Sequence, residues 1–258
     1  HGFNGKGYEL TQQLASNLGF NNSIVPNRTS LETSINYLLA LSFQGMILGK
    51  IANEIYILMS QSINEISEKQ TKGQVGSSTM PHKVNPVIIL QVIEEAAILR
   101  GKASTTIEAG MPLHEGDLRY NKIVDNLIKD STVLSLKLSQ KFNSMLNNLL
   151  INSKQMQRNL LNEKDYIASE NLMYKLGKYL GRQEAHDLIH LIIKKSVKNN
   201  LSAKEQFLND PVISKYFTTA DVENILNPLK YIGESKKISL KMSKFGIKKA
   251  TEIHARST

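Results

Sequence analysis

The sequence predicts an all-α protein, with an elongated central helical bundle followed by a small C-terminal helical domain. Apolar residues recur at three- and four-residue steps over segments that exceed the usual helix length of about 11 to 12 residues. Glycine and proline separate these segments. After Asn152 the segments become shorter. We therefore expect a bundle domain at residues 1–151 and a C-terminal domain at residues 152–258.

The first long helix is expected between about Leu31 and Glu68. Pro26 prevents an upstream helix from continuing into it, because proline lacks the amide hydrogen that a helix interior requires. Gly45 and Gly49 lie four residues apart and would let a neighbouring helix approach closely, although chance explains this spacing equally well. The predicted stripe of apolar or small residues consists of Leu41, Gly45, Leu48, Ala52, Ile55 and Met59.

A polar stretch, Gly73–Pro86, follows this helix, and we call it the signature segment. Its part Gly76–Pro86 has the sequence Gly-Ser-Ser-Thr-Met-Pro-His-Lys-Val-Asn-Pro. Glycine permits a tight turn, and the backbone amides of such a turn can bind an anion. The serines add hydroxyls, Lys83 a positive charge and Asn85 an amide. These groups suit a site that holds a carboxylate and moves a proton beside it. The alternative is an ordinary surface connection between helices.

Two more long helices are expected, at about residues 87–106 and 117–150. Gly110, Pro112 and Gly116 mark the link between them. A single layer of three such helices would leave apolar flanks in water, so we expect other subunits to bury part of their surface. The stripe of the last helix consists of Leu127, Leu134, Leu138, Phe142, Met145 and Leu149.

The C-terminal domain is predicted to contain short helices. Gly181 is suited to end one of them, and Thr218 and Thr219 are candidate N-caps. The expected helices span about residues 154–161, 167–180, 183–198, 203–208 and 220–226.

Composition limits the class of protein. Of the 258 residues, 41% are hydrophobic and 21% are charged, which is typical of a globular protein. The absence of cysteine excludes disulfides and leaves the compartment open, with the cytoplasm as the default. No uninterrupted apolar run reaches the roughly 18 residues of a membrane span, and no signal peptide is recognisable. The start at His1 suggests a fragment.

The net charge of +9 raises the question of nucleic-acid binding. Lysine and arginine are spread along the chain apart from one dense run, which is typical of a solvated tail and disfavours a nucleic-acid partner. A positive surface also attracts a polyanionic small substrate. The dense run consists of Lys236, Lys237, Lys241, Lys244, Lys248 and Lys249.

The signature segment resembles that of the fumarase/aspartase superfamily, Gly-Ser-Ser-x-Met-Pro-x-Lys-x-Asn, at every fixed position. The order of long helices around it is similar too. The segment His114–Asp117 resembles the His-Glu-Arg-Asp motif of the branch with adenylosuccinate lyase and 3-carboxy-cis,cis-muconate cycloisomerase. The C-terminal stretches Gly181–His186, Asp210–Val212 and Asn227–Gly233 are more similar to the cycloisomerase group.

This resemblance implies a mostly helical subunit of three domains that forms a homotetramer through a long bundle, with active sites where three subunits meet. The family's N-terminal domain, with its histidines that act as acid and substrate ligands, is absent from this sequence. Long helices with uncovered apolar flanks fit such an assembly.

The chemistry that the resemblance implies is anti β-elimination on a succinyl-type carboxylate, usually with release of fumarate, or the reverse addition. It requires no cofactor and no metal. Ser77 corresponds to the catalytic base, and its alkoxide needs stabilisation by amides and a cation. Lys83 and Asn85 correspond to residues that hold the substrate carboxylate, and the other substrate-binding candidates are Ser78, Thr79 and Met80.

Several positions depart from the family pattern. Leu31 and Glu32 replace an Arg-Asp pair, and Gly116 replaces the arginine of the His-Glu-Arg-Asp motif. Asn121 and Asp125 replace a serine and an arginine that bind the nucleotide phosphate in adenylosuccinate lyases. These changes argue against adenylosuccinate as the substrate. A cycloisomerase-like enzyme, and a degenerate homologue that acts as a scaffold, are the alternatives.

Other polar residues have competing interpretations. His114 and Asp117 form either a charge pair that fixes the link or a catalytic pair, and the structural role is favoured. Glu94 and Glu95 orient Lys83 or lie on a helix surface. His186 and His190 have the spacing of metal ligands on a helix, but a third ligand is not evident, which favours a surface role.

Overall fold

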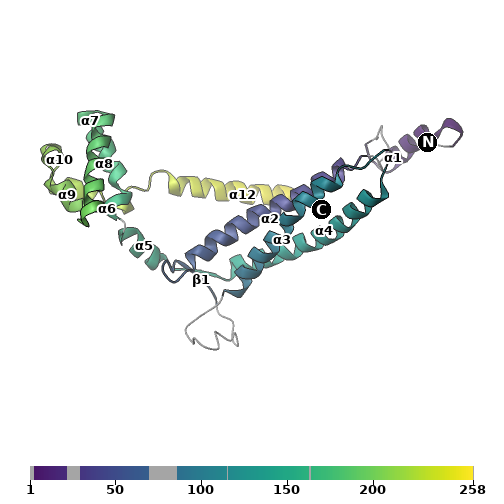
Figure 1. Ribbon diagram of the computed structural model, residues 1–258, viewed down its shortest axis with the longest axis horizontal. Coiled ribbons are helices and arrows are strands. Elements are labelled where there is room, and N and C mark those ends of the chain that lie inside the picture. Colours follow the sequence, from purple (N-terminus) through teal and green to yellow (C-terminus); the bar gives the residue numbers. More distant parts are fainter. Residues whose placement is uncertain (1–2, 22–29, 70–85, 115, 163, 258) are drawn as a thin grey trace. The chain divides into compact units, whose positions relative to one another are not determined.

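The computed structural model describes residues 3–21, 30–69, 86–114, 116–162 and 164–257 (Figure 1). The chain divides into two compact units, His1–Asn152 and Ser153–Thr258. Almost all of the described secondary structure is helical, which confirms the predicted all-α class. We call the first part the bundle unit and the second the C-terminal unit, and each is described by itself.

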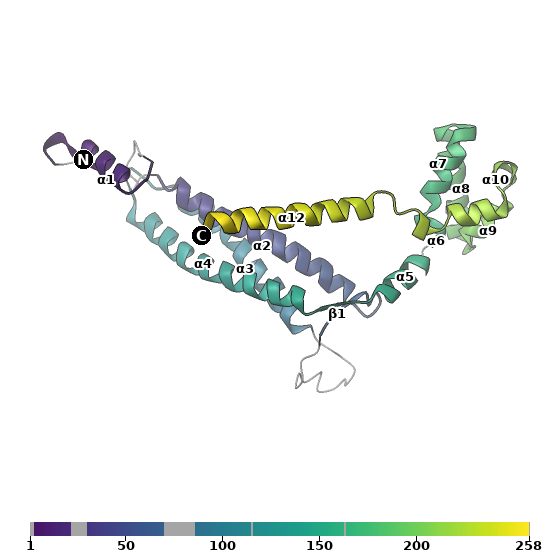
Figure 2. The ribbon, with the colours of Figure 1, turned by 180° about the vertical axis from the view of Figure 1, so that it is seen from behind.

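Three long helices form the bundle unit, and both ribbon views show them alongside one another (Figures 1 and 2). They are α2 (Glu32–Leu58), α3 (Val87–Ala109) and α4 (Leu118–Asn147), and each packs against the other two. A short 3-10 helix, η1 (Phe3–Gly5), and α1 (Gly7–Asn17) precede them.

The first long helix is shorter than predicted. The sequence pattern suggested a helix as far as Glu68, but α2 ends at Leu58. The chain then turns, with Asn64 at a positive φ of 52°. It continues as strand β1 (Ile66–Glu68), which pairs antiparallel with β2 (Leu149–Ile151). This ladder was not predicted, because strands of three residues carry too little periodicity to be recognised in the sequence.

Close approach of α2 and α3 depends on two glycines. A Cβ atom at Gly45 would lie 3.0 Å from the carbonyl oxygen of Ala96, and one at Gly49 would lie 2.3 Å from Nη1 of Arg100. That guanidinium donates a hydrogen bond of 3.2 Å to the carbonyl oxygen of Gly45. The predicted role of these glycines in helix packing is confirmed.

Polar contacts fix α2 against α4. The hydroxyls of Tyr37 and Thr132 lie 2.8 Å apart. The Gln44 amide donates to Ser139 Oγ at 2.7 Å and accepts from Ser135. The Gln44 contacts in particular favour one register between the helices, because a shift would leave half-buried polar atoms without partners.

By length and composition α2 is able to cross a membrane, with a mean hydropathy of 1.3 over its best window. Polar residues interrupt its apolar sequence, so the absence of an uninterrupted apolar run did not predict this property. This is weak evidence for a membrane span, because a helix in the core of a soluble bundle passes the same test.

The bundle unit leaves many large apolar side chains uncovered. Phe43 is 59% exposed on α2, Ile98 is 49% exposed on α3, and Leu136 is 60% exposed on α4. The buried side of the bundle includes Leu38, Val124 and Leu127. All three long helices are thus apolar on more faces than this unit covers.

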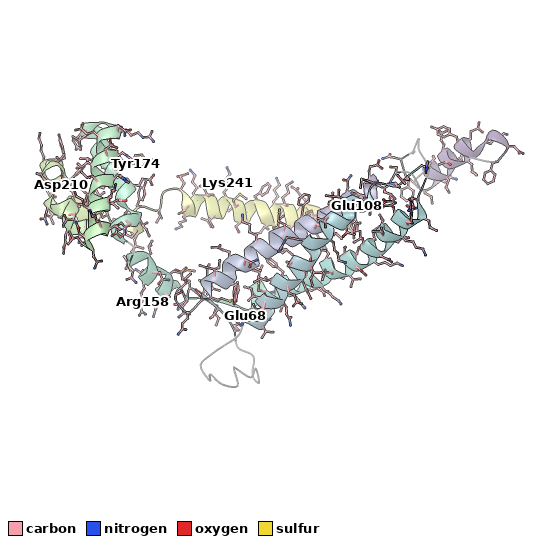
Figure 3. All side chains as sticks on the ribbon, in the orientation of Figure 1. Glu68, Glu108, Arg158, Tyr174, Asp210 and Lys241 are labelled. Carbon is pink, nitrogen blue, oxygen red and sulfur yellow. The ribbon has the colours of Figure 1, made fainter. Side chains whose placement is uncertain are left out.

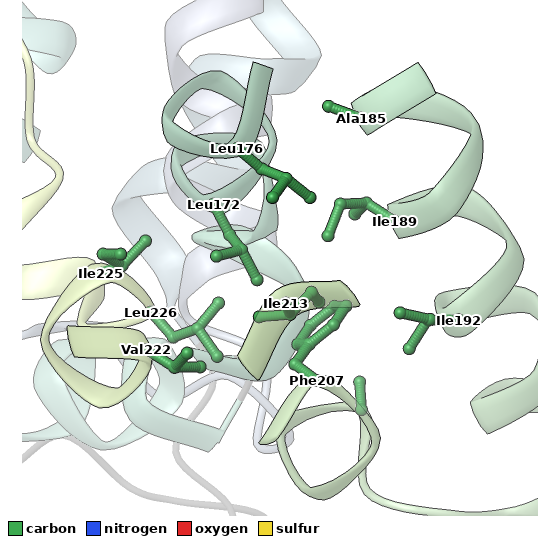
Figure 4. Packing of buried hydrophobic residues seen from close by; sticks show 11 residues of the cluster. Leu172, Leu176, Ala185, Ile189, Ile192, Phe207, Ile213, Val222, Ile225 and Leu226 are labelled. Carbon is green, nitrogen blue, oxygen red and sulfur yellow. The ribbon is translucent and has the colours of Figure 1, made fainter. Parts of the chain in front are cut away.

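The C-terminal unit has a compact core, in which side chains from several short helices point toward one another (Figure 4). Phe207 and Ile213 are fully buried there and lie beside Leu172 and Leu176. The helices are α5 (Ser153–Asn162), α6 (Lys164–Ile167), α7 (Ser169–Leu180), α8 (Arg182–Asn199), α9 (Ala203–Asn209), α10 (Pro211–Tyr216), α11 (Thr219–Ile225), the 3-10 helix η2 (Pro228–Lys230) and α12 (Ser235–Ser257).

Local sequence explains the helix ends of this unit. Gly181 ends α7 with a φ of 85°, as its expected role as a C-cap requires. Thr218, and not Thr219, is the N-cap of α11, where it forms a capping box with Asp221. The dense run of lysines lies on α12 with its side chains exposed.

Candidate active site

The residues that the sequence predicts for catalysis and substrate binding all belong to the signature segment. Residues 70–85 lie outside the part of the chain that the structure describes. Their roles therefore stay predictions, and the structure informs the site through the residues on either side. The predicted residues concerned are Ser77, Ser78, Thr79, Met80, Lys83 and Asn85.

Strand β1 and helix α3 flank this segment in the sequence, and a side chain joins them. Oε1 of Glu68, at the end of β1, accepts a hydrogen bond of 2.9 Å from the backbone amide of Ile89 in the first turn of α3. Figure 3 labels Glu68 at this end of the bundle unit. Lys69 donates its amide to the carbonyl oxygen of Asn148 at 2.8 Å. The described residues on both sides of the segment are thus connected by hydrogen bonds, to one another and to the end of α4.

The link before α4 is fixed by Asp117. Its Oδ1 accepts from the backbone amide and from Nε of Arg119, both at 3.0 Å, and its Oδ2 lies 2.7 Å from Nη2 of Arg119. The side-chain hydrogen bond from Arg119 lowers the pKa of the Asp117 carboxyl, and the charge of His114 also lowers it. Arg119, which was not predicted, is thus the hydrogen-bonded partner of Asp117, and the predicted charge interaction with His114 is present as well.

Two residues that depart from the family pattern lie one turn apart on α4. Asp125 is exposed, whereas Asn121 is half-buried. Within the described part of the chain, Oδ1 of Asn121 is buried and lacks a hydrogen-bond partner. The other departures, Leu31 and Glu32, lie at the start of α2, where Ser30 donates to the Glu32 carboxylate and lowers its pKa.

The acidic residues of α3 do not share one role. Glu95 is half-buried and its Oε1 lies 2.5 Å from Nζ of Lys141 on α4. Its Oε2 is buried without a partner in the described residues. Glu94 is exposed, as a helix-surface carboxylate would be. The pairing with Lys141 gives Glu95 a partner within the bundle unit.

A separate pocket of about 270 Å³ lies in the C-terminal unit between α7 and α8. Glu170, His186 and His190 line it above the apolar side chains of Met173 and Ile189. Searched over its described residues, the chain contains no group of three side chains that could hold a metal ion. His186 instead lies 3.1 Å from Asp187, whose pKa it lowers by hydrogen bonding.

Tyr231 takes part in a contact that the sequence analysis did not predict. Its hydroxyl donates to Oε2 of Glu170 at 2.9 Å, which raises the pKa of the tyrosine. The two residues are 61 positions apart, so only the fold shows that they meet.

Comparison with known proteins adds two family matches. Residues 1–100 match a model of a lyase family, and residues 165–241 match the family described as the adenylosuccinate lyase C-terminus. The first match contains the signature segment, and the second includes the pocket and most of the core of the C-terminal unit.

Several curated proteins are similar over most of this chain. The N-acetyl-S-(2-succino)cysteine lyase of Dickeya dadantii is 31% identical over 230 residues, which cover 89% of this chain and 50% of that protein. The adenylosuccinate lyase of Pyrococcus horikoshii is 30% identical over 245 residues, or 94% of this chain and 54% of that protein. The chain thus spans about half the length of the curated relatives it matches.

Solved structures have the same fold. A fumarate lyase from Mesorhizobium matches with a TM-score of 0.76 at 20% identity, over 90% of this chain and 51% of that one. The 3-carboxy-cis,cis-muconate lactonizing enzyme of Pseudomonas putida matches with a TM-score of 0.73 at 25% identity, over 90% of this chain and 52% of that one.

The fold and the two family matches are those of helical proteins that are described as lyases. The chain belongs to the fumarase/aspartase superfamily, in the branch that contains adenylosuccinate lyase and 3-carboxy-cis,cis-muconate cycloisomerase. This confirms the family that the signature segment indicated.

Proposed function

We propose that the protein catalyses anti β-elimination, or the reverse addition, on a succinyl-type carboxylate and typically releases fumarate. The observation that carries this proposal is the complete signature segment, with Ser77, Lys83 and Asn85 all present. The names of the relatives support it, because both adenylosuccinate and N-acetyl-S-(2-succino)cysteine contain a succinyl group.

In the proposed mechanism Ser77 removes the proton beside a substrate carboxylate. That proton is weakly acidic, so the developing negative charge needs positive charge and hydrogen-bond donors that are placed in advance. Lys83 and Asn85 supply these groups, and Ser78, Thr79 and Met80 add contacts. An acid then protonates the leaving group, and the reaction needs neither a metal nor a cofactor.

We further propose that the substrate lacks a phosphate. Asp125 is exposed on α4, where a carboxylate would repel a phosphate group, and Gly116 offers no positive side chain in the neighbouring link. The name of the Dickeya relative describes a succinyl group on sulfur without a phosphate. A thioether of this kind fits the residues better than adenylosuccinate does.

The specificity is tested by giving the full-length protein adenylosuccinate and N-acetyl-S-(2-succino)cysteine separately, while fumarate formation is followed by ultraviolet absorbance. We expect turnover of the phosphate-free compound and poor turnover of adenylosuccinate. Efficient AMP release would contradict the specificity. If neither compound reacts, a 3-carboxymuconate substrate tests the cycloisomerase-like alternative, and failure there would favour a scaffold.

We also propose that the protein is a homotetramer in which subunits share active sites. The uncovered apolar faces of α2, α3 and α4 support this, because contiguous apolar surface of this kind marks an interface. A cytoplasmic location, without a membrane or nucleic-acid partner, remains part of the proposal. Light scattering tests the assembly, and a stable monomer at micromolar concentration would contradict it.

A further inference from the structure

Glu68 occupies an unusual place, because it belongs to a strand and yet caps a helix. Its carboxylate accepts a hydrogen bond from the amide of Ile89, 21 positions later in the sequence. Ile89 is the third residue of α3, and the amide at this position is the usual target of an N-capping side chain. The cap is therefore supplied from outside the helix.

The start of α3 has no suitable cap of its own. Its N-cap position is held by Pro86, whose side chain makes no capping hydrogen bond, and the first turn contains no acidic residue. The first amides of a helix lack partners within it, and the helix dipole favours a negative charge nearby. Glu68 meets both needs, since it accepts one of these amides and brings a carboxylate to the helix start.

The backbone of Glu68 is itself held in place. Glu68 is paired with Leu149 in the β1–β2 ladder, and the next residue donates its amide to Asn148. The carboxylate of Glu68 consequently connects the start of α3 to the strand that follows α4.

We propose that Glu68 is a positioning residue for the reaction, and that it acts by fixing where α3 begins. Asn85 directly precedes Pro86 in the sequence, and Lys83 is two positions earlier, so the start of α3 is the point from which the chain leads back to both residues. Small displacements of groups that hold a substrate cause large losses of rate. This inference rests on the function proposed above, but the contact on which it depends can be tested separately.

Three substitutions of Glu68 separate the effects of its length, its charge and its hydrogen-bond acceptor. Glu68→Gln keeps the length and an acceptor oxygen, Glu68→Asp keeps the charge but shortens the reach, and Glu68→Ala removes the cap. We expect kcat to fall about 10- to 100-fold for the alanine variant, nearly as much for aspartate, and less than about threefold for glutamine. The peptide containing Ile89 should exchange its amide hydrogens faster in the same order.

Asp210→Ala is the matched control, because Asp210 caps α10 in the C-terminal unit by accepting from Val212 and Ile213. It removes a carboxylate cap that does not join residues flanking the signature segment in the sequence, and kcat should stay at the level of the unchanged protein. Figure 3 labels both carboxylates.

The outcomes are distinct. If Glu68→Ala and Asp210→Ala lower the melting temperature alike and both leave kcat within about twofold, Glu68 is only structural and the proposal is wrong. Unchanged exchange at Ile89 in Glu68→Ala would also overturn it, whether or not the protein is active. If the alanine variant does not fold, the aspartate and glutamine variants decide by the same criteria. Loss of activity with faster exchange, restored by glutamine, supports it.

Discussion

The two units of this chain differ in the source of the side chains that cap their helices. In the C-terminal unit short helices close around Phe207 and Ile213, and their ends are capped by neighbouring side chains such as Asp210 and Thr218. In the bundle unit α2 begins without a side-chain cap at Leu31, and α3 depends on Glu68 from another element. Side-chain caps from the adjoining sequence thus occur in both units, since Asp117 also caps α4, whereas the start of α3 depends on a residue 21 positions away in the sequence.

The exposed apolar residues are distributed differently in the two units. In the bundle unit they lie along every long helix, whereas in the C-terminal unit many of them lie along α12, outside the core that the other helices form. A unit that leaves apolar faces uncovered is suited to association, because those faces are stabilised only when another surface buries them. The uncovered faces of the bundle unit support the proposed assembly.

The largest effect should come from the signature segment. Ser77→Ala should abolish turnover in the full-length protein, with a loss of at least about 100-fold, because it removes a positioned general base. Substrate binding should be spared, since the hydroxyl acts in proton abstraction and not in holding the ground state. Lys83→Ala should impair both, because its charge meets the substrate carboxylate before and during the reaction.

Kinetic and binding measurements on these two variants separate the roles. Near-normal turnover of Ser77→Ala with an identified substrate would contradict the mechanism. The melting temperature should be unchanged by either substitution if the segment serves chemistry and not folding.

The next largest effects should distinguish the buried core of the C-terminal unit from the exposed apolar face of the bundle unit. Phe207→Ala should destabilise the protein by about 3 to 5 kcal/mol, because the side chain is fully buried and its removal leaves a cavity. Phe43→Ala, on the exposed face of α2, should change the stability of an isolated subunit little but weaken subunit association. Thermal unfolding measures the first effect, and light scattering at several concentrations measures the second. Phe43→Glu places a charge on the same exposed face of α2, and an unchanged oligomeric state in this variant would contradict the proposed interface.

The same comparison explains how much the sequence could predict. Two helices were expected at 87–106 and 117–150 and occur at Val87–Ala109 and Leu118–Asn147, because long apolar stripes end at glycine, proline and a capping residue. The predicted end of the first long helix, at about Glu68, was wrong, because the apolar pattern continues through Ile63 and Ile66 into a turn and a strand.

Within the candidate site, sequence could identify residue types but not their partners. The signature segment indicated the family, yet the contacts of Glu68 with Ile89 and of Tyr231 with Glu170 join positions far apart in the chain. Arg119 is only two residues from Asp117, but the family motif indicated His114 as the partner of Asp117, so the hydrogen bonds with Arg119 were not predicted. Pairing of this kind depends on side-chain direction, which a spacing pattern does not specify.

The smallest effects should appear as opposite pH dependences of the two units. Arg119 lowers the pKa of Asp117, so its stabilising contribution is complete above the ordinary aspartate pKa of about 3.9 and is lost as pH falls through the lower folded-state value. The hydrogen bond to Glu170 raises the pKa of Tyr231, so its contribution is complete below about 10 and is lost as pH rises through the higher folded-state value. Melting temperatures of Arg119→Ala and Tyr231→Phe, each compared with the unchanged protein across pH, test both. The Arg119→Ala difference should vanish only in acid, and the Tyr231→Phe difference only in alkali. A Tyr231→Phe difference that persists at alkaline pH would show that packing of the ring, and not the hydrogen bond to Glu170, joins the end of η2 to α7.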